Sequence, residues 1–346
     1  MSFSFPKLSL PLAGSSAAPT LGHRLVDVYL EVVAARLRRN SMLAIAYDLK
    51  VFFTVVDVDP VEVRRRDVLT FIRIQRTGSA DATVVPIDGG DGLALSTIRR
   101  RLSSLSGFYA HLVALGEMDH NPVQRGMPVR SPVTRDRRVV PLVRPVRHLP
   151  QILDTGEVTA LLAALRTSRD RAMIEAMLLA GLRRSEVLGL RHSDVRWGEH
   201  RLFIADGKGG HQRLVPISPR FFTTLRAYLD HERPTETVTD RVFVVLKGPN
   251  RGRALTAKGL EEIMTSARAR AGLSHGTCHE LRHTCFTRLR EAGMALEALQ
   301  AQAGHRSISA TQIYLHLAND WLAGEYRRAA EAIDAQAAIG RKVRAS

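Results

Sequence analysis

Cysteine is scarce in this chain of 346 residues, which contains only Cys278 and Cys285. Both fall in one predicted helix, two turns and therefore roughly 10 Å apart. A disulfide needs Cα atoms within about 7 Å of each other, so this pair is not expected to form one. The chain is therefore expected to be a soluble, cytosolic protein with reduced thiols.

Long hydrophobic runs are also missing, because arginine interrupts the apolar stretches every few residues. A membrane-spanning helix needs about 20 consecutive apolar residues, so no membrane span is expected. The N-terminal stretch has one lysine and no sustained apolar segment, so no signal peptide is expected. Residues 1–20 are predicted to form a flexible tail.

Acidic residues are too few to balance the basic ones. The chain has 50 Lys and Arg against 34 Asp and Glu, which leaves a formal net charge of +16 and a pI near 10.8. This surplus favours a polyanionic partner. The length is enough for roughly two domains.

The first predicted domain, residues 21–123, has apolar residues at helical spacing throughout and is expected to be a small helical bundle. Asp59 and Pro60 predict the start of its third helix, with Asp59 as N-cap. Near the start of its last helix, expected from about 95 to 115, lie three candidate DNA-binding residues: Arg99, Arg100 and Arg101.

A different composition marks residues 124–150. Pro128, Pro132, Pro141 and Pro145 are expected to exclude regular structure there, and seven arginines face a single acid, Asp136. We predict an interdomain linker that also lies along phosphates, with contacts from Arg135, Arg137 and Arg138.

The second predicted domain spans residues 151–320. Asp154 and Glu157 predict a capping box at the start of its first helix. Two short strands, 201–205 and 212–217, flank a glycine-rich turn and indicate a hairpin, and a further strand is expected over 242–246. Residues 321–346 are expected to form a C-terminal helix and tail. The predicted fold class is mainly α with a small antiparallel β-sheet (α+β).

Side chains suited to a phosphodiester gather near the end of this domain. His279 and Arg282 are spaced to share one helical face, and His305 precedes Tyr314 on the next short helix. A guanidinium forks onto non-bridging oxygens, an imidazole donates hydrogen bonds or moves protons, and a phenol can attack phosphorus.

Four blocks of the sequence, taken together and in this order, resemble the tyrosine recombinases, or phage integrase superfamily. They are Gly-Leu-Arg-Arg-Ser-Glu at 181–186, Gly-Lys-Gly-Gly at 207–210 with Arg-Leu-Val-Pro at 213–216, His-Glu-Leu-Arg-His-Thr at 279–284, and Gly-His at 304–305 with Thr-Gln-Ile-Tyr-Leu-His at 311–316. The N-terminal bundle resembles the family's core-binding (SAM-like) domain only in size and helix content.

The resemblance implies metal-independent cleavage of DNA without a cofactor. Tyr314 would attack a phosphate to give a 3′-phosphotyrosine and a free 5′-hydroxyl, while Arg183 and Arg282 clamp the non-bridging oxygens. Lys208 would protonate the leaving oxygen. His279 would assist proton transfer at the nucleophile, and His305 would donate a hydrogen bond to the phosphate.

The partner implied is double-stranded DNA, bound by a homo- or hetero-tetramer whose subunits are monomers or weakly associated when free. The C-terminal helix is expected either to cap its own domain or to dock on a neighbouring protomer. The resemblance leaves the role open between chromosome-dimer resolution and integration, excision or transposition of a mobile element, and we favour the mobile element.

Two other functions fit parts of this residue set. A type IB topoisomerase shares much of this residue set, and a catalytically silent DNA-binding accessory protein is a third possibility. Cys278, His279, His283 and Cys285 do not share the helical face that a tetrahedral zinc site needs, so no metal is expected. Glu186 is predicted to orient an active-site arginine or to lie on a helix surface. His283 is predicted to pack or hydrogen-bond in the core.

Overall fold

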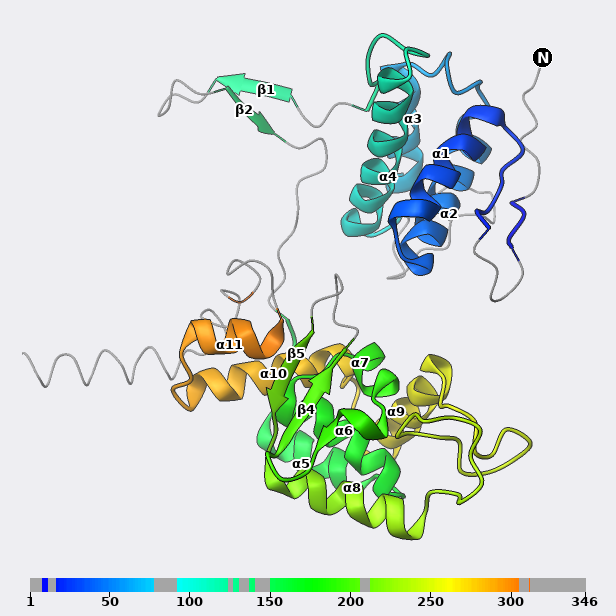
Figure 1. Cartoon of the computed structure of the whole chain (residues 1–346). Coiled ribbons are helices and arrows are strands. Elements are labelled where there is room, and N and C mark those ends of the chain that lie inside the picture. Colours follow the sequence, from blue (N-terminus) through cyan, green and yellow to red (C-terminus); the bar gives the residue numbers. More distant parts are fainter. Residues whose placement is uncertain are drawn as a thin grey trace, which may run out of the picture. The chain divides into compact units, whose positions relative to one another are not determined.

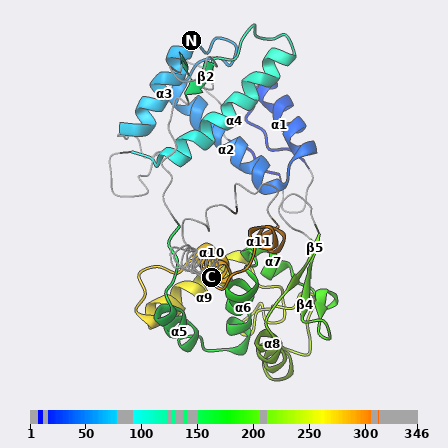
Figure 2. The same cartoon turned by 90° about the vertical axis from the view of Figure 1, so that its left-hand side faces the viewer.

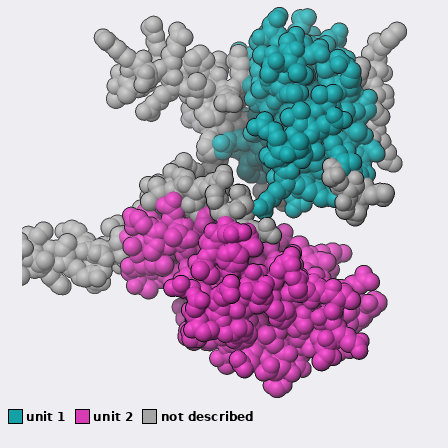
Figure 3. Space-filling view, viewed as in Figure 1, with its two compact units in different colours: residues 1–147 teal, residues 148–346 magenta. Residues whose placement is uncertain are grey.

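The computed structural model describes residues 8–11, 17–77, 92–123, 127–130, 137–140, 150–205, 212–304 and 311. The chain divides into two compact units, residues 1–147 and 148–346 (Figure 3). Each unit has its own hydrophobic core. Among the described helices, none is both long and apolar enough to cross a membrane.

The described part of the first unit contains four helices, shown in Figures 1 and 2: α1 (Arg24–Arg36), α2 (Arg39–Val56), α3 (Arg65–Thr77) and α4 (Leu95–Ala114). Aromatic rings from three of them meet in its core. Phe52 packs edge-on against Phe71, and Phe53 packs edge-on against Phe108, with ring centroids 5.1 and 5.9 Å apart. These contacts bury the apolar stripes of α2, α3 and α4 against one another.

The expectation that Asp59 and Pro60 start a helix is wrong, because α3 begins at Arg65. Asp59 instead closes a turn, accepting hydrogen bonds from the Val61 amide on its side chain and from the Glu62 amide on its backbone carbonyl. The carboxylate of Asp67 accepts from the Arg64 amide at 2.8 Å, so a side chain inside the first turn satisfies the backbone at the helix start.

The expectation that prolines exclude regular structure from residues 124–150 is also wrong. Two strands, β1 (Met127–Arg130) and β2 (Arg137–Val140), form an antiparallel pair in which Pro128 lies opposite Val139. In a two-stranded ribbon both strands are edges, where proline is tolerated because its missing N–H can face away from the partner.

The second unit is mainly helical, as predicted. Its elements are α5 (Thr155–Ala163), α6 (Ser168–Ala180), α7 (Arg184–Gly189), the 3-10 helix η1 (His192–Asp194), α8 (Pro219–His231), α9 (Ala257–Ala271), α10 (Cys278–Glu291) and α11 (Leu296–Ala303), with strands β3 (Val195–Arg196), β4 (Arg201–Ile204) and β5 (Arg213–Pro216). The strands form an antiparallel sheet in the order β3-β4-β5, with Leu202 opposite Val215. The strand expected over 242–246 is reduced to one bridge between Val244 and Ala254.

Helix α6 lies at the centre of this unit, in contact with both α8 and α10 (Figure 1). Most of its residues are buried, so it has no face exposed to solvent. The predicted capping box holds the start of α5, where Asp154 and Glu157 each accept from the other's backbone amide. The turn after α6, at Gly181, leads directly to Arg183, the first of the candidate site residues.

Candidate active site

The turn between α6 and α7 depends on Gly181. Its φ is +65°, and a Cβ atom there would lie 2.4 Å from Cζ of Phe286 on α10. A residue with a side chain would therefore be strained in its backbone and would also clash with the ring. Glycine allows α10 to approach closely and leaves the Gly181 carbonyl facing Arg282.

Arg183 follows as the N-cap residue of α7 and is held by Glu186, three residues later. Its backbone N–H donates to Oε2 of Glu186 at 2.9 Å, and its Nη1 donates to Oε1 at 2.8 Å. The Glu186 side chain is only 1% exposed, whereas that of Arg183 is 22% exposed. The guanidinium is thus anchored from the protein side and still reaches the surface.

A second arginine, Arg213 at the start of β5, binds the same carboxylate. Its Nη1 and Nη2 donate to Oε1 and Oε2 of Glu186 at 3.0 and 2.9 Å. Its Nε donates to the backbone carbonyl of Gln302 at 3.2 Å. The sequence placed Arg213 in the Arg-Leu-Val-Pro block but gave no sign that it pairs with Glu186.

Glu186 therefore accepts four hydrogen bonds from two arginines, three from guanidinium groups and one from the Arg183 backbone amide. Burial alone would raise the pKa of its carboxyl. The hydrogen bonds and charge of Arg213, with the backbone amide and guanidinium of Arg183, instead hold that pKa below its usual value. Glu186 is thus a buried anion that fixes both arginines. Of the two predictions for it, the orienting role fits this burial and the surface acid does not.

Arg282, on α10, is 3% exposed and its guanidinium lies inside the protein. Nη2 donates to the Ala303 carbonyl at 2.7 Å, Nη1 donates to the Gly181 carbonyl, and Cζ lies 4.7 Å from the centre of the Phe286 ring. These contacts tie Arg282 to the turn that precedes Arg183 and to the end of α11.

His279 lies one helical turn before His283 on α10. Their Nε2 atoms are 3.0 Å apart, and their ring centroids are 4.4 Å apart. A hydrogen bond between two Nε2 atoms requires one to carry a proton and the other to accept. His283 is half-buried and its partner His279 is exposed, so this contact lies at the surface and not in the core as predicted.

The remaining three predicted catalytic residues, Lys208, His305 and Tyr314, lie outside the described residues. The described residues that flank two of them in the sequence, Arg213 and Gly304, contact each other. Arg213 begins the strand that follows the segment containing Lys208. Gly304, directly before His305, has a φ of +61°, and a Cβ there would lie 3.1 Å from Nη1 of Arg213.

The predicted DNA-binding arginines of the first unit differ in their surroundings. Arg99 is exposed. Arg100 donates to the buried carboxylate of Asp48 at 2.5 Å while its side chain stays 50% exposed. Arg101 is 13% exposed and donates to Gln75, and burial, with Arg100 nearby, lowers its pKa although Asp48 raises it. Of the three side chains, only that of Arg101 is largely buried in the bundle.

The other three predicted DNA-binding residues fall in the segment predicted as a linker, which belongs to the first unit. Arg135 lies outside the described residues, and Arg137 and Arg138 lie in β2.

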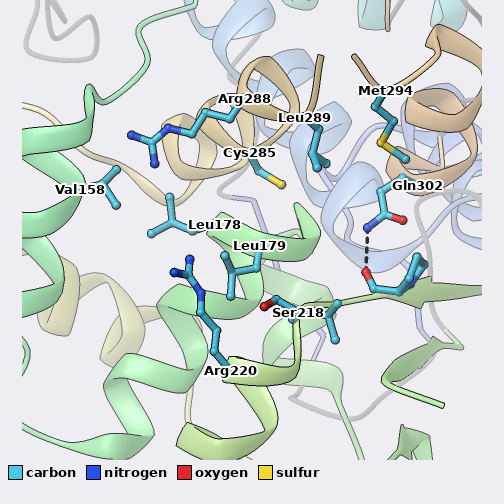
Figure 4. A pocket seen from close by; sticks show the side chains of 12 residues that line it. Val158, Leu178, Leu179, Ser218, Arg220, Cys285, Arg288, Leu289, Met294 and Gln302 are labelled. Carbon is cyan, nitrogen blue, oxygen red and sulfur yellow. Dashed lines mark hydrogen bonds between the residues drawn. The ribbon is translucent and has the colours of Figure 1, made fainter. Parts of the chain in front are cut away.

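A pocket of about 460 Å³ lies between α10, α6 and the start of α8 (Figure 4). Its walls are mostly aliphatic, and neither Arg183 nor Arg282 contributes to them. At one end the Gln302 side chain donates to the Pro216 carbonyl at 3.1 Å. Neither Glu186 nor Arg213 lines this pocket, although Gln302, which does, accepts from Arg213 on its backbone carbonyl.

Both cysteines lie on α10, where Cys278 is half-buried and Cys285 is buried. Burial, the largest effect, raises the pKa of Cys278 to about 11 and that of Cys285 to about 12. Both thiols are therefore protonated at neutral pH. Within the described ranges, no group of three or more His, Cys, Asp or Glu residues could hold a metal ion.

Comparison with known proteins gives consistent matches. The phage integrase family model matches residues 151–320. Tyrosine recombinase XerD of Lacticaseibacillus casei is 34% identical over 246 residues, covering 69% of this chain and 78% of that protein. The Tn1549 transposon integrase, solved in complex with transposon right end DNA, has a TM-score of 0.65 at 18% identity, covering 88% of this chain and 99% of that one. A lambda integrase tetramer bound to a Holliday junction has a TM-score of 0.61 at 19% identity, and the match covers 84% of this chain and 76% of the lambda integrase chain.

Proposed function

This chain belongs to the phage integrase family, the tyrosine recombinases, and we propose that it is a site-specific DNA recombinase acting through a 3′-phosphotyrosine on Tyr314. The observation that carries the proposal is the arrangement of two arginines. Arg183 is anchored by a buried carboxylate, and Arg282 is anchored by carbonyls at the turn before Arg183 and at the end of α11. Both are thus positioned before any substrate binds.

The two arginines suit a transition state in which negative charge grows on a phosphate. As the phenolic oxygen of Tyr314 forms a bond to phosphorus, the bond to the 5′-oxygen breaks and the non-bridging oxygens gain charge. A preorganised guanidinium stabilises that charge without reorganising during the reaction, and its fork matches two oxygens. Lysine at either position would keep the charge and lose the fork.

Two protons must move, one from the Tyr314 hydroxyl and one to the leaving 5′-oxygen. We assign the second to Lys208 and assistance at the nucleophile to His279, while His305 donates a hydrogen bond to the phosphate. The His279–His283 contact supports a neutral imidazole in the pair, since two imidazolium rings could not share that hydrogen bond. The phosphotyrosine keeps the phosphodiester energy, so a 5′-hydroxyl of another duplex can attack it and rejoin DNA without ATP. The chemistry requires no metal or cofactor.

We further propose that the protein acts on double-stranded DNA as a homo- or hetero-tetramer. The similar lambda integrase was solved as a tetramer on a Holliday junction. Residues 21–123 would serve as the core-binding domain, 124–150 as a linker along phosphates, and 151–320 as the catalytic domain. Residues 321–346 would dock on a neighbouring protomer. Deleting them should leave DNA binding intact and abolish recombination.

Arg99 is our first candidate for a phosphate contact from the bundle, because its side chain is exposed, and Arg100 is a second. Arg135, Arg137 and Arg138 remain candidates in the linker. Binding by such contacts should weaken steeply with salt as counterions are released. We place the activity in the cytoplasm and favour integration, excision or transposition of a mobile element over dimer resolution.

Covalent trapping tests this function. A nicked suicide substrate, selected from DNA that the protein binds, loses a short fragment after cleavage and so prevents rejoining. Wild type and Tyr326→Phe should form a covalent adduct, and Tyr314→Phe should form none. Absence of an adduct with wild type would overturn the enzymatic function and leave a DNA-binding accessory protein. Relaxation of plasmids lacking any specific site would favour a topoisomerase.

A further inference from the structure

Arg213 is absent from the set of residues that the motifs assign to catalysis, although it lies at the centre of the described site. It is the first residue of β5, its side chain is 11% exposed, and its hydrogen bonds to Glu186 and Gln302 point inward. It thereby joins α7, through Glu186, to the end of α11, through the Gln302 carbonyl.

Each oxygen of Glu186 is shared between the two arginines. Oε1 accepts Nη1 of Arg183 at 2.8 Å and Nη1 of Arg213 at 3.0 Å. Oε2 accepts the Arg183 backbone amide at 2.9 Å and Nη2 of Arg213 at 2.9 Å. The bidentate contact from Arg213 fixes the plane of the carboxylate, and that plane fixes where Arg183 can bind it.

Arg213 is itself held from the opposite side. Gly304 packs against its side chain so closely that a Cβ would lie 3.1 to 3.2 Å from three of its atoms. The Gln302 side chain donates to the Ala180 carbonyl at 3.3 Å and to the Pro216 carbonyl at 3.1 Å, the second contact being drawn in Figure 4. The end of α11, β5 and the α6–α7 turn are thus joined around one guanidinium.

We propose that Arg213 is a positioning residue for the reaction, acting on Arg183 through Glu186; this inference rests on the proposed function. Without Arg213, Glu186 loses two of its four donors and turns toward other partners. Arg183 then keeps its charge and loses the orientation that places its fork on the phosphate. A displacement of about 1 Å at such a group costs on the order of 10²-fold in rate.

A buried ion pair can also serve stability alone, so the test must separate positioning from folding. We would measure single-turnover cleavage on the suicide substrate at saturating enzyme for wild type, Arg213→Met, Arg183→Lys and the double variant. If Arg213 acts through Arg183, Arg213→Met slows cleavage about 10²-fold in the wild-type background and less than about 3-fold beside Arg183→Lys. Equal factors in both backgrounds would overturn the proposal.

Arg169→Met is the matched control. Arg169 is 10% exposed, pairs with the buried Asp170 and donates to the Val244 carbonyl, but it makes no contact with Glu186. Its effect on cleavage should be the same in both backgrounds. If Arg213→Met does not fold, as judged by its thermal unfolding, Arg213→Lys supplies the same cycle because lysine keeps the charge but cannot make the bidentate contact.

A substrate with a neutral methylphosphonate at the cleavage site gives a second readout. It removes the charge that Arg183 stabilises, so Arg213→Met should lose less than about 10-fold there relative to wild type. An equal loss on both substrates would contradict positioning. If wild type forms no adduct on ordinary DNA, the proposed function fails. If wild type reacts and Arg213→Met loses the same factor in rate on both substrates, the proposed role of Arg213 is wrong and the proposed function stands.

Discussion

Replacing Glu186 with glutamine should both destabilise the second unit and disable cleavage. The carboxylate is 1% exposed and accepts four hydrogen bonds from two arginines. The amide that replaces it is uncharged and has one acceptor atom instead of two, so its NH₂ group faces guanidinium donors. Removing one member of a buried, hydrogen-bonded ion pair costs about 3–5 kcal/mol, and we expect a loss in that range.

The assay is urea unfolding followed by tryptophan fluorescence. The chain has two tryptophans, Trp197 and Trp321, and both lie in residues 148–346, so the signal reports that unit. Cleavage of the suicide substrate should fall at least about 10²-fold, because Arg183 loses its anchor. Glu186→Asp should recover part of the stability, since it restores the charge on a shorter side chain.

Glu175→Gln is the matched control. Glu175 is 4% exposed, and burial raises the pKa of its carboxyl despite a hydrogen bond with Thr224 and the charges of Arg171 and Arg220. Its glutamine variant should lose much less stability than Glu186→Gln, because burial already disfavours the charged form. Equal losses at the two positions would refute the reasoning that the Glu186 charge holds this part of the fold together.

The pH dependence of the Glu186 effect has a definite sign. Its folded-state pKa lies below the ordinary value of about 4.3, so its contribution is fully present above that pH and is lost as pH falls through the folded-state pKa. The stability gap between wild type and Glu186→Gln should therefore be constant from about pH 6 to 8 and shrink below about pH 4. A gap that grows on acidification would contradict a lowered pKa.

Gly181→Ala should lose more than about 1 kcal/mol in the same urea assay, because a φ of +65° and the Phe286 ring both oppose a Cβ. An unchanged free energy of unfolding would show that the turn at Gly181 tolerates a side chain. Arg101→Met should lower the thermal unfolding temperature of the first unit, whereas Arg99→Met should leave it unchanged and reduce the salt dependence of DNA binding by about one counterion. The reverse pattern would contradict their assigned environments. Cys285, with a pKa raised to about 12, should resist alkylation in the native protein at pH 8 and react only on unfolding; rapid native-state labelling would contradict its burial.

Local sequence patterns predicted much of the second unit. Asp154 and Glu157 form the capping box that their spacing indicates. The hairpin strands lie within one or two residues of the predicted ends. Such features depend on neighbours a few residues apart, which a sequence displays directly.

Contacts between distant residues could not be predicted in the same way. Arg213 pairs with Glu186 across 27 positions, and Arg282 donates to a carbonyl at Gly181, 101 positions away. The motifs placed these residues near one another without showing which donor meets which acceptor. The helix start predicted at Pro60 was wrong for another reason. The Asp59 side chain accepts the Val61 amide in a short local turn, and this turn takes the place of a helix start.

The most direct test of the account identifies the atom that joins protein to DNA. Trypsin digestion of the trapped adduct should give the peptide Ser307–Arg327, which contains two tyrosines, Tyr314 and Tyr326. Fragmentation in a mass spectrometer should place the nucleotide on Tyr314, linked through a 3′-phosphate, with a 5′-hydroxyl on the released strand. A nucleotide on Tyr326, a 5′-phosphate linkage, or no modified peptide at all would contradict it.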